Sequence, residues 1–172
     1  MVRLFIAIGF IMFSFYLSTG VSGKALQGDL DSYLPPHDYA VTQPLKPTES
    51  IAKKAVHEEE NWIEDIDLAY EEAKNKQQLL FVDFTGKTCT NCRWMEKNMF
   101  VHPEIQPELG KYIPVRLWTD YGEKKEEYQQ LQMKLFNSVA LPFYAIMDSE
   151  GNVVKSFSGM TRSVEEFKTF LK

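Results

Sequence analysis

Residues 79–92 read LLFVDFTGKTCTNC and join a short apolar run to the only two cysteines of the chain, Cys89 and Cys92. A run that is apolar at successive positions is typical of a central strand covered by helices on both faces. The cysteines follow it at the expected start of a helix, where side chains three positions apart lie on one face. Unpaired N–H groups there favour the anionic form of Cys89, and the second thiol can resolve a mixed disulfide. The stretch therefore predicts thiol–disulfide exchange.

Two other interpretations of the cysteine pair are half of a metal site and a structural disulfide. A four-ligand zinc site would need two further Cys or His side chains. The chain has only His37, His57 and His102, and none of them stands at ligand spacing from another. We therefore favour redox chemistry and expect neither a metal ligand set nor a cofactor.

Hydrophobic periodicity on both sides of this stretch predicts alternating helices and strands. A helix is expected from Trp62 to Lys76, and the helix that carries the cysteines should run to about Met99. The remaining expected elements are a short helix at 105–109, a strand at 113–118, a helix at 123–136, strands at 142–147 and 153–157, and a last helix at 163–171. The turn at 148–152 makes the last two strands an antiparallel hairpin. This order predicts an α/β fold with a central mixed β-sheet flanked by helices.

The N-terminal part of the chain has a different character. Residues 4–17 read LFIAIGFIMFSFYL behind Arg3, which is typical of an export signal or a membrane anchor. A spanning helix needs roughly 17 to 25 residues, a length reached only by counting through Val21. We predict residues 1–23 as signal peptide or membrane anchor, residues 24–56 as a proline-containing, largely extended linker, and residues 57–172 as the globular domain.

The charge of the chain restricts the class of partner. The formal net charge is −5, and acidic clusters such as Glu58-Glu59-Glu60 alternate with scattered lysines. Nucleic-acid binding requires a basic patch, so we expect no nucleic-acid partner.

The motifs in residues 58–172 resemble the thioredoxin fold: a strand ending in FVDFTGKTCTNC, a later proline at the entry to a strand, a hairpin and a terminal helix. More narrowly, the sequence CRWMEK at 92–97, with Met99-Phe100 and a His-Pro-Glu start at 102–104, is similar to the C-terminal periplasmic domain of the DsbD family of thiol:disulfide interchange proteins. The apolar N-terminal segment followed by LDSYLPP at 30–36 resembles the junction before that domain. The resemblance implies that the chain corresponds to the tail of a longer membrane reductase.

The resemblance also implies roles for four residues. Cys89 matches the exposed nucleophile, Cys92 the buried resolving thiol, Asp83 the carboxylate behind them, and Glu96 a second acid. Asp83 is the one charged residue of its apolar run, so burial should raise its pKa. Glu96 stands four residues after Cys92, on the same side of the helix. Two such acids could take up and return the proton of disulfide cleavage. A strand-end cap at Asp83 and an ordinary exposed glutamate at Glu96 are the alternatives.

Pro142 matches the cis-proline of the fold and Leu141 the residue before it. A cis bond there would turn main-chain groups of Leu141 toward Cys89, where a substrate strand could pair with them. A trans proline at the first residue of a strand is the alternative. The tryptophan that commonly precedes the first cysteine is replaced by Thr88, and the pair between the cysteines is Thr90-Asn91.

These observations predict an extracytoplasmic thiol–disulfide oxidoreductase that reduces protein disulfides, anchored to the membrane by its N-terminal helix or released by cleavage. Its partners would be disulfide-bonded substrate proteins and a membrane or soluble thiol electron donor. The alternatives are an oxidase or isomerase of the same fold, and a non-catalytic assembly module that uses the two cysteines as soft metal ligands.

Overall fold

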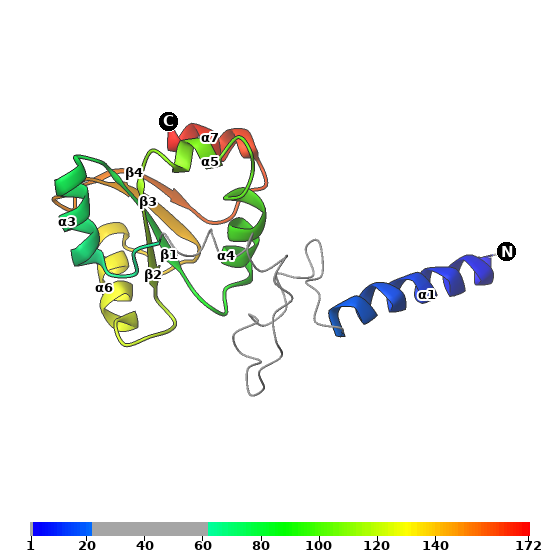
Figure 1. Ribbon diagram of the computed structural model, residues 1–172. Coiled ribbons are helices and arrows are strands. Elements are labelled where there is room, and N and C mark those ends of the chain that lie inside the picture. Colours follow the sequence, from blue (N-terminus) through cyan, green and yellow to red (C-terminus); the bar gives the residue numbers. More distant parts are fainter. Residues whose placement is uncertain (1, 22–61) are drawn as a thin grey trace, which may run out of the picture. The chain divides into compact units, whose positions relative to one another are not determined.

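The computed structural model describes residues 2–21 and 62–172, which fall into two separate units (Figure 1). The predicted linker at 24–56 lies outside the described residues, as do the boundaries expected near 23 and 57.

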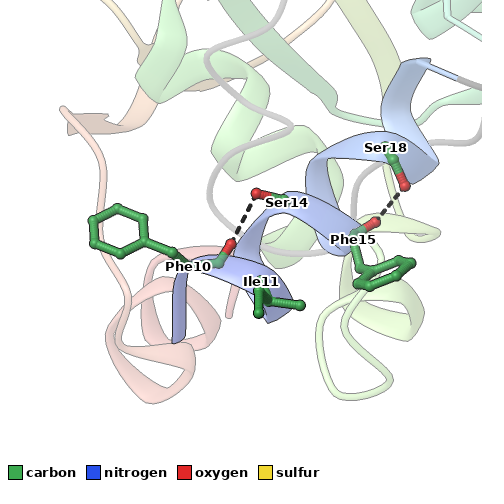
Figure 2. A pocket seen from close by; sticks show the side chains of 5 residues that line it. All are labelled: Phe10, Ile11, Ser14, Phe15 and Ser18. Carbon is green, nitrogen blue, oxygen red and sulfur yellow. Dashed lines mark hydrogen bonds between the residues drawn. The ribbon is translucent and has the colours of Figure 1, made fainter. Parts of the chain in front are cut away.

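The N-terminal unit contains helix α1 (Val2–Val21), formed by the apolar segment. Its side chains from Val2 to Ser18 are largely exposed, with Phe10 at 68% and Phe15 at 72%. The hydroxyls of Ser14 and Ser18 donate to the carbonyls of Phe10 and Phe15, each at 2.8 Å, so these polar groups are satisfied on the helix itself. With Ile11, these four residues line an open hollow of about 330 Å³. Figure 2 draws the five side chains. No helix in the described part of the chain is both long and apolar enough to cross a membrane.

The second unit is built on a four-stranded sheet in the order β2-β1-β3-β4. The strands are β1 (Leu80–Thr85), β2 (Ile113–Trp118), β3 (Phe143–Met147) and β4 (Val153–Ser158). The long connection between β1 and β2 contains helices, and these two strands are parallel. β3 runs antiparallel to β1 and to β4, which it meets through the tight turn at Asp148. The predicted α/β architecture with a mixed sheet is therefore confirmed.

Helices cover both faces of the sheet (Figure 1). Helices α3 (Ile66–Lys76) and α6 (Lys125–Phe136) lie on one face. The other face carries α4 (Thr90–Trp94), the π-helical turn η3 (Met95–Met99), α5 (Gln106–Leu109) and α7 (Val164–Leu171).

Strand β1 is buried along its whole length because helices pack on both of its faces. Leu80, Val82 and Phe84 join the core under α3 and α6. Phe81 points to the other face and joins an aromatic cluster with η3 and α7. Successive strand residues alternate in direction, so Asp83 shares the face of Phe81 and lies on the side of the cysteine-bearing helix.

The expected start of the first helix at Trp62 is wrong. Helix α3 begins at Ile66, because the Asp65 side chain caps it by accepting hydrogen bonds from the Asp67 and Leu68 N–H groups. Residues 62–64 are extended instead, and Ile63 bridges to Val115 of β2. Trp62 consequently packs in the aromatic cluster on the other face of the sheet.

Phe81 is predicted to be a main contributor to stability. Its ring is fully buried and lies 5.7–6.5 Å from the rings of five neighbours. We expect Phe81→Ala to lower the free energy of unfolding by about 3–5 kcal/mol, because it removes a large apolar group and leaves a cavity. Urea denaturation followed by circular dichroism measures this loss. Leu68→Ala on the exposed side of α3 is the control and should change stability by no more than about 0.5 kcal/mol; equal losses in the two variants would contradict the assignment.

Candidate active site

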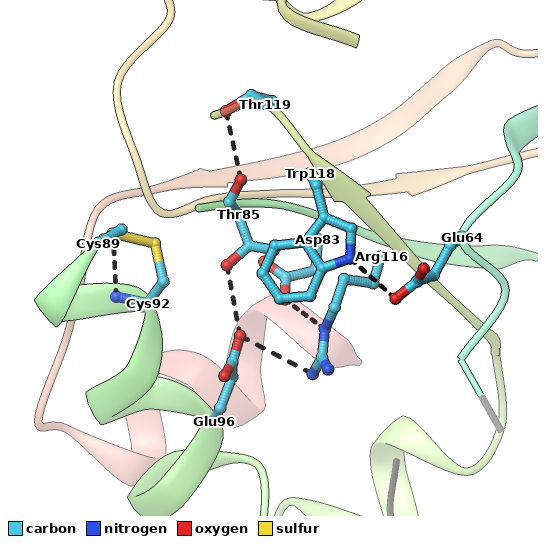
Figure 3. A network of polar contacts seen from close by, with 9 residues as sticks. All are labelled: Glu64, Asp83, Thr85, Cys89, Cys92, Glu96, Arg116, Trp118 and Thr119. Atoms are coloured by element: carbon cyan, nitrogen blue, oxygen red, sulfur yellow. Dashed lines mark hydrogen bonds and ion pairs between the residues drawn. A yellow bond between two sulfur atoms is a disulfide. The ribbon is translucent and has the colours of Figure 1, made fainter. Parts of the chain in front are cut away.

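The two cysteines lie at the junction between the β1 loop and helix α4, and they form a disulfide with a Cα–Cα distance of 5.3 Å (Figure 3). Cys89 is the N-cap residue of α4, and its Sγ accepts a hydrogen bond from the Cys92 N–H at 3.2 Å. That N–H is one of the donors which a helix start leaves unpaired. Cys92 is buried at 1% exposure, whereas Cys89 is only half-buried. An external sulfur can therefore approach Cys89 more readily than Cys92.

Asp83 and Glu96 both lie on the face of the sheet that carries these cysteines. Asp83 is fully buried, and neither of its carboxyl oxygens has a hydrogen-bond partner in the described residues. Glu96 extends from η3, one turn after Cys92, and accepts a hydrogen bond from the Thr85 hydroxyl at 3.3 Å (Figure 3). The structure places Asp83 in the interior, not at the strand end as a cap, and Glu96 is not an ordinary exposed helix residue.

Arg116 forms long ion pairs with both acids, and the sequence analysis did not identify this residue. It stands opposite Asp83 in the parallel register of β1 and β2. Its Nε lies 3.9 Å from Asp83 Oδ2 and its Nη2 lies 3.8 Å from Glu96 Oε1 (Figure 3). The available signal was a charged residue inside the apolar strand IPVRLW, the same signal that pointed to Asp83.

Burial raises the pKa of the Asp83 carboxyl well above its ordinary value of 3.8, and the charge of Glu96 raises it further. The Arg116 guanidinium opposes this shift, but burial prevails. Both ion-pair distances exceed the length of a good hydrogen bond, so Arg116 compensates the carboxyl only in part. Asp83 therefore keeps its proton to a higher pH than an exposed aspartate would, as is common for carboxyl groups that exchange protons in active sites.

Asp120 fixes the loop that precedes Cys89, and it was also missed. Its carboxylate accepts hydrogen bonds from the Lys87 N–H at 2.8 Å, the Thr88 N–H at 3.0 Å and the Thr88 hydroxyl at 2.8 Å. A Cβ atom at Gly86 would lie 2.8 Å from Asp120 Oδ2, so only glycine allows this close approach. Thr88, which replaces the usual tryptophan, is thus part of the anchoring of the loop.

The peptide bond between Leu141 and Pro142 is cis. Leu141 packs against the loop before Cys89, since its Cδ1 would lie 3.1 Å from a Cβ at Gly86. These residues are therefore close to the cysteine-bearing loop, and their role in substrate binding stays a prediction. Within the described residues, no cluster of three or more His, Cys, Asp or Glu side chains could hold a metal ion.

Comparisons with known proteins agree with this architecture. The sequence profile of a family described as "Thioredoxin-like" matches residues 61–149. A thioredoxin from Thermus thermophilus superposes with a TM-score of 0.52 at 18% identity, covering 64% of this chain and 83% of its own. The reduced C-terminal domain of DsbD from Neisseria meningitidis gives a TM-score of 0.52 at 18% identity, covering 63% of this chain and 96% of its own. No curated protein matches the chain.

The two solved structures share the fold, and the family profile covers the strand, loop and helix that carry the cysteines together with β2 and β3. The resemblance predicted from the sequence is therefore confirmed, and the chain belongs to the thioredoxin-like family.

Proposed function

We propose that this protein reduces disulfide bonds of extracytoplasmic proteins through the Cys89–Cys92 pair. The two cysteines in a thioredoxin-like domain fit a thiol–disulfide oxidoreductase. The observation that carries the proposal is the combination of a half-buried Cys89, a buried Cys92 and two acids on the same side of the sheet, Asp83 buried and Glu96 partly exposed.

The reaction begins with the reduced dithiol. The Cys89 thiolate attacks one sulfur of the substrate disulfide, forming a mixed disulfide and releasing a substrate thiolate, which takes up a proton. Cys92 then loses its proton and attacks Cys89 Sγ, releasing the second substrate thiolate. The substrate gains two electrons, and the protein ends with the Cys89–Cys92 disulfide seen in the structure. A thiol donor must reduce this disulfide before the next cycle.

Proton transfer at the second step is the task proposed for Asp83 and Glu96. A buried thiol is a poor nucleophile until it loses its proton, and a carboxylate with a raised pKa is a base matched to that step. The proton can pass to Asp83 and return when the disulfide is reduced again.

The same acids support the reductive direction. Negative charge behind the sulfurs disfavours thiolates and so favours the disulfide over the reduced pair. A dithiol whose oxidised form is favoured gives up its electrons readily. The resemblance to the DsbD domain points the same way, whereas an oxidase would need a strongly stabilised Cys89 thiolate.

The order of attack can be tested by trapping. We expect Cys92→Ser to accumulate mixed disulfides through Cys89, because the half-buried sulfur attacks and nothing resolves the adduct. Non-reducing gel electrophoresis and mass spectrometry after reaction with a disulfide-bonded protein detect the adducts. Cys89→Ser is the matched control; accumulation of adducts in that variant instead would reverse the assignment of the two cysteines.

Asp83→Asn should slow disulfide exchange and stabilise the fold. The exchange rate at pH 7 should fall by about 100-fold, a typical contribution of general acid–base catalysis. Because the pKa of Asp83 is raised in the folded state, its stabilising contribution is complete below pH 3.8 and is lost as pH rises through the folded pKa. An amide at position 83 does not ionise, so the stability of the variant does not fall as pH rises. At neutral pH its free energy of unfolding should exceed that of the native protein by about 1–3 kcal/mol. This difference should shrink toward acid pH.

Stopped-flow exchange kinetics and urea denaturation at several pH values measure the two effects. Glu71→Gln, the same acid-to-amide change at an exposed position of α3, is the control and should alter neither quantity. An Asp83→Asn protein with native exchange rates and a native pH profile of stability would exclude Asp83 from proton transfer.

The location of the domain is part of the proposal. We expect residues 1–23 to export the domain and to hold it at the membrane, since the exposed apolar side chains of α1 favour an apolar environment. Cell fractionation of the full chain, with mass spectrometry of the mature N-terminus, tests this. A soluble product that starts near Lys24 would rule out the anchor, and retention in the cytoplasm would rule out export.

A further inference from the structure

Residues 62–64, which we call the edge segment, lie along the outer edge of β2. Ile63 donates its N–H to the Pro114 carbonyl at 3.0 Å and accepts from the Arg116 N–H at 2.9 Å. The Glu64 carboxylate accepts from the Trp118 indole N–H at 2.8 Å, and the Glu64 carbonyl accepts from the Tyr128 hydroxyl at 2.9 Å. These four hydrogen bonds hold the edge segment in a defined position beside Arg116.

The edge segment places an aromatic ring against the Arg116 guanidinium. The guanidinium carbon lies 4.5 Å from the centre of the Trp62 ring and 5.6 Å from the centre of the Trp118 ring. Trp62 is itself held by Phe81 and Phe100, whose ring centres lie 6.0 Å and 5.9 Å away. A guanidinium is weakly hydrated and binds well to such a ring face.

The ring contacts matter because the carboxylates hold Arg116 only loosely. Its separations from Asp83 and Glu96 are 3.9 Å and 3.8 Å, and its buried Nε has no hydrogen-bond partner in the described residues. The face of Trp62, at 4.5 Å, is the closer of the two ring contacts that support this guanidinium. Without it the long side chain could turn toward water, as arginine side chains commonly do.

We propose that Trp62 is a positioning residue for the acid pair, because its ring holds the Arg116 guanidinium beside the Asp83 and Glu96 carboxyl groups. The inference deepens the proposed function, on which it rests. Trp62 does not touch the sulfurs and acts only through Arg116.

The charged and titratable groups around the acid pair come from every element packed there. They are Asp83 of β1, Arg116 of β2, Tyr144 of β3, Glu96 of η3 and the two cysteines at α4. Burial raises the pKa of the Tyr144 hydroxyl, so it stays neutral across the relevant range. In the oxidised protein the cysteines do not titrate. In the oxidised protein, titration therefore reports on the two acids, under the influence of the Arg116 charge that faces them.

The test is a carbon-13 NMR titration of the Asp83 and Glu96 carboxyl carbons in the oxidised full chain. We expect Trp62→Leu to move the titration of the pair upward by about half a pH unit, because the acids lose part of the opposing positive charge. Arg116→Gln should move it at least as far, and Trp62→Leu should add nothing in that background. Trp62→Phe, which restores a ring face, should return the titration to the native position.

Phe170→Leu is the matched control. Phe170 belongs to the same aromatic cluster, and its ring centre lies 6.5 Å from that of Phe81. Its ring contacts within the described residues are with other aromatic rings. It should lower stability without moving the titration. If Trp62→Leu does not fold, Trp62→Met takes its place, since its unbranched, flexible side chain adapts better to the space that the ring leaves.

A native titration in a folded Trp62→Leu or Trp62→Met protein would overturn the inference, as would an equal shift in Phe170→Leu. The proposed function is judged separately, by the exchange rate of the native protein with a disulfide-bonded substrate. Absence of exchange there would refute the proposed function, whereas normal exchange with an unshifted titration would refute only the role of Trp62.

Discussion

A carboxyl group buried at the centre of the sheet sets the requirements for the rest of this structure. Asp83 lies in β1, which is covered on both faces, and its oxygens lack hydrogen-bond partners in the described residues. Burying such a group costs free energy, which the apolar residues on either side of it in β1 must offset. Phe81 and Phe84 do so by packing into opposite cores. The fold tolerates the buried carboxyl group only because the other residues of the strand are so apolar.

Different elements around Asp83 supply the other residues of the candidate site. At the start of α4, Cys89 is partly exposed and Cys92 is buried. The turn η3 places Glu96 beside Thr85 and Arg116. Asp120 holds the loop before Cys89, while Leu141 packs on the same loop. Glu96, Asp120 and Leu141 come from the β1–β2, β2–α6 and α6–β3 connections, so the sheet is the frame that brings distant segments to one place.

Local patterns were sufficient for the fold class and for placing Asp83 inside a buried strand that leads to the cysteine pair. The strand at 113–118 matched its expected bounds, and the others were displaced by a residue or so. Periodicity failed at Trp62, where the spacing suited a helix but the Asp65 cap and the bonds of Ile63 to β2 prevailed. The π-helical turn after α4 was not foreseen, because it has no distinct composition.

By itself the sequence determined the alternation of helices and strands, the position of the cysteine pair after a buried strand, and the charge of Asp83 within that strand. These follow from spacing along the chain. Only the tertiary structure decided which groups meet Asp83. Arg116 is 33 residues away and faces it through strand register, and Trp62 reaches Arg116 through an extended edge segment that periodicity assigned to a helix. Register and edge pairing depend on contacts between distant segments, and no local pattern carries that information.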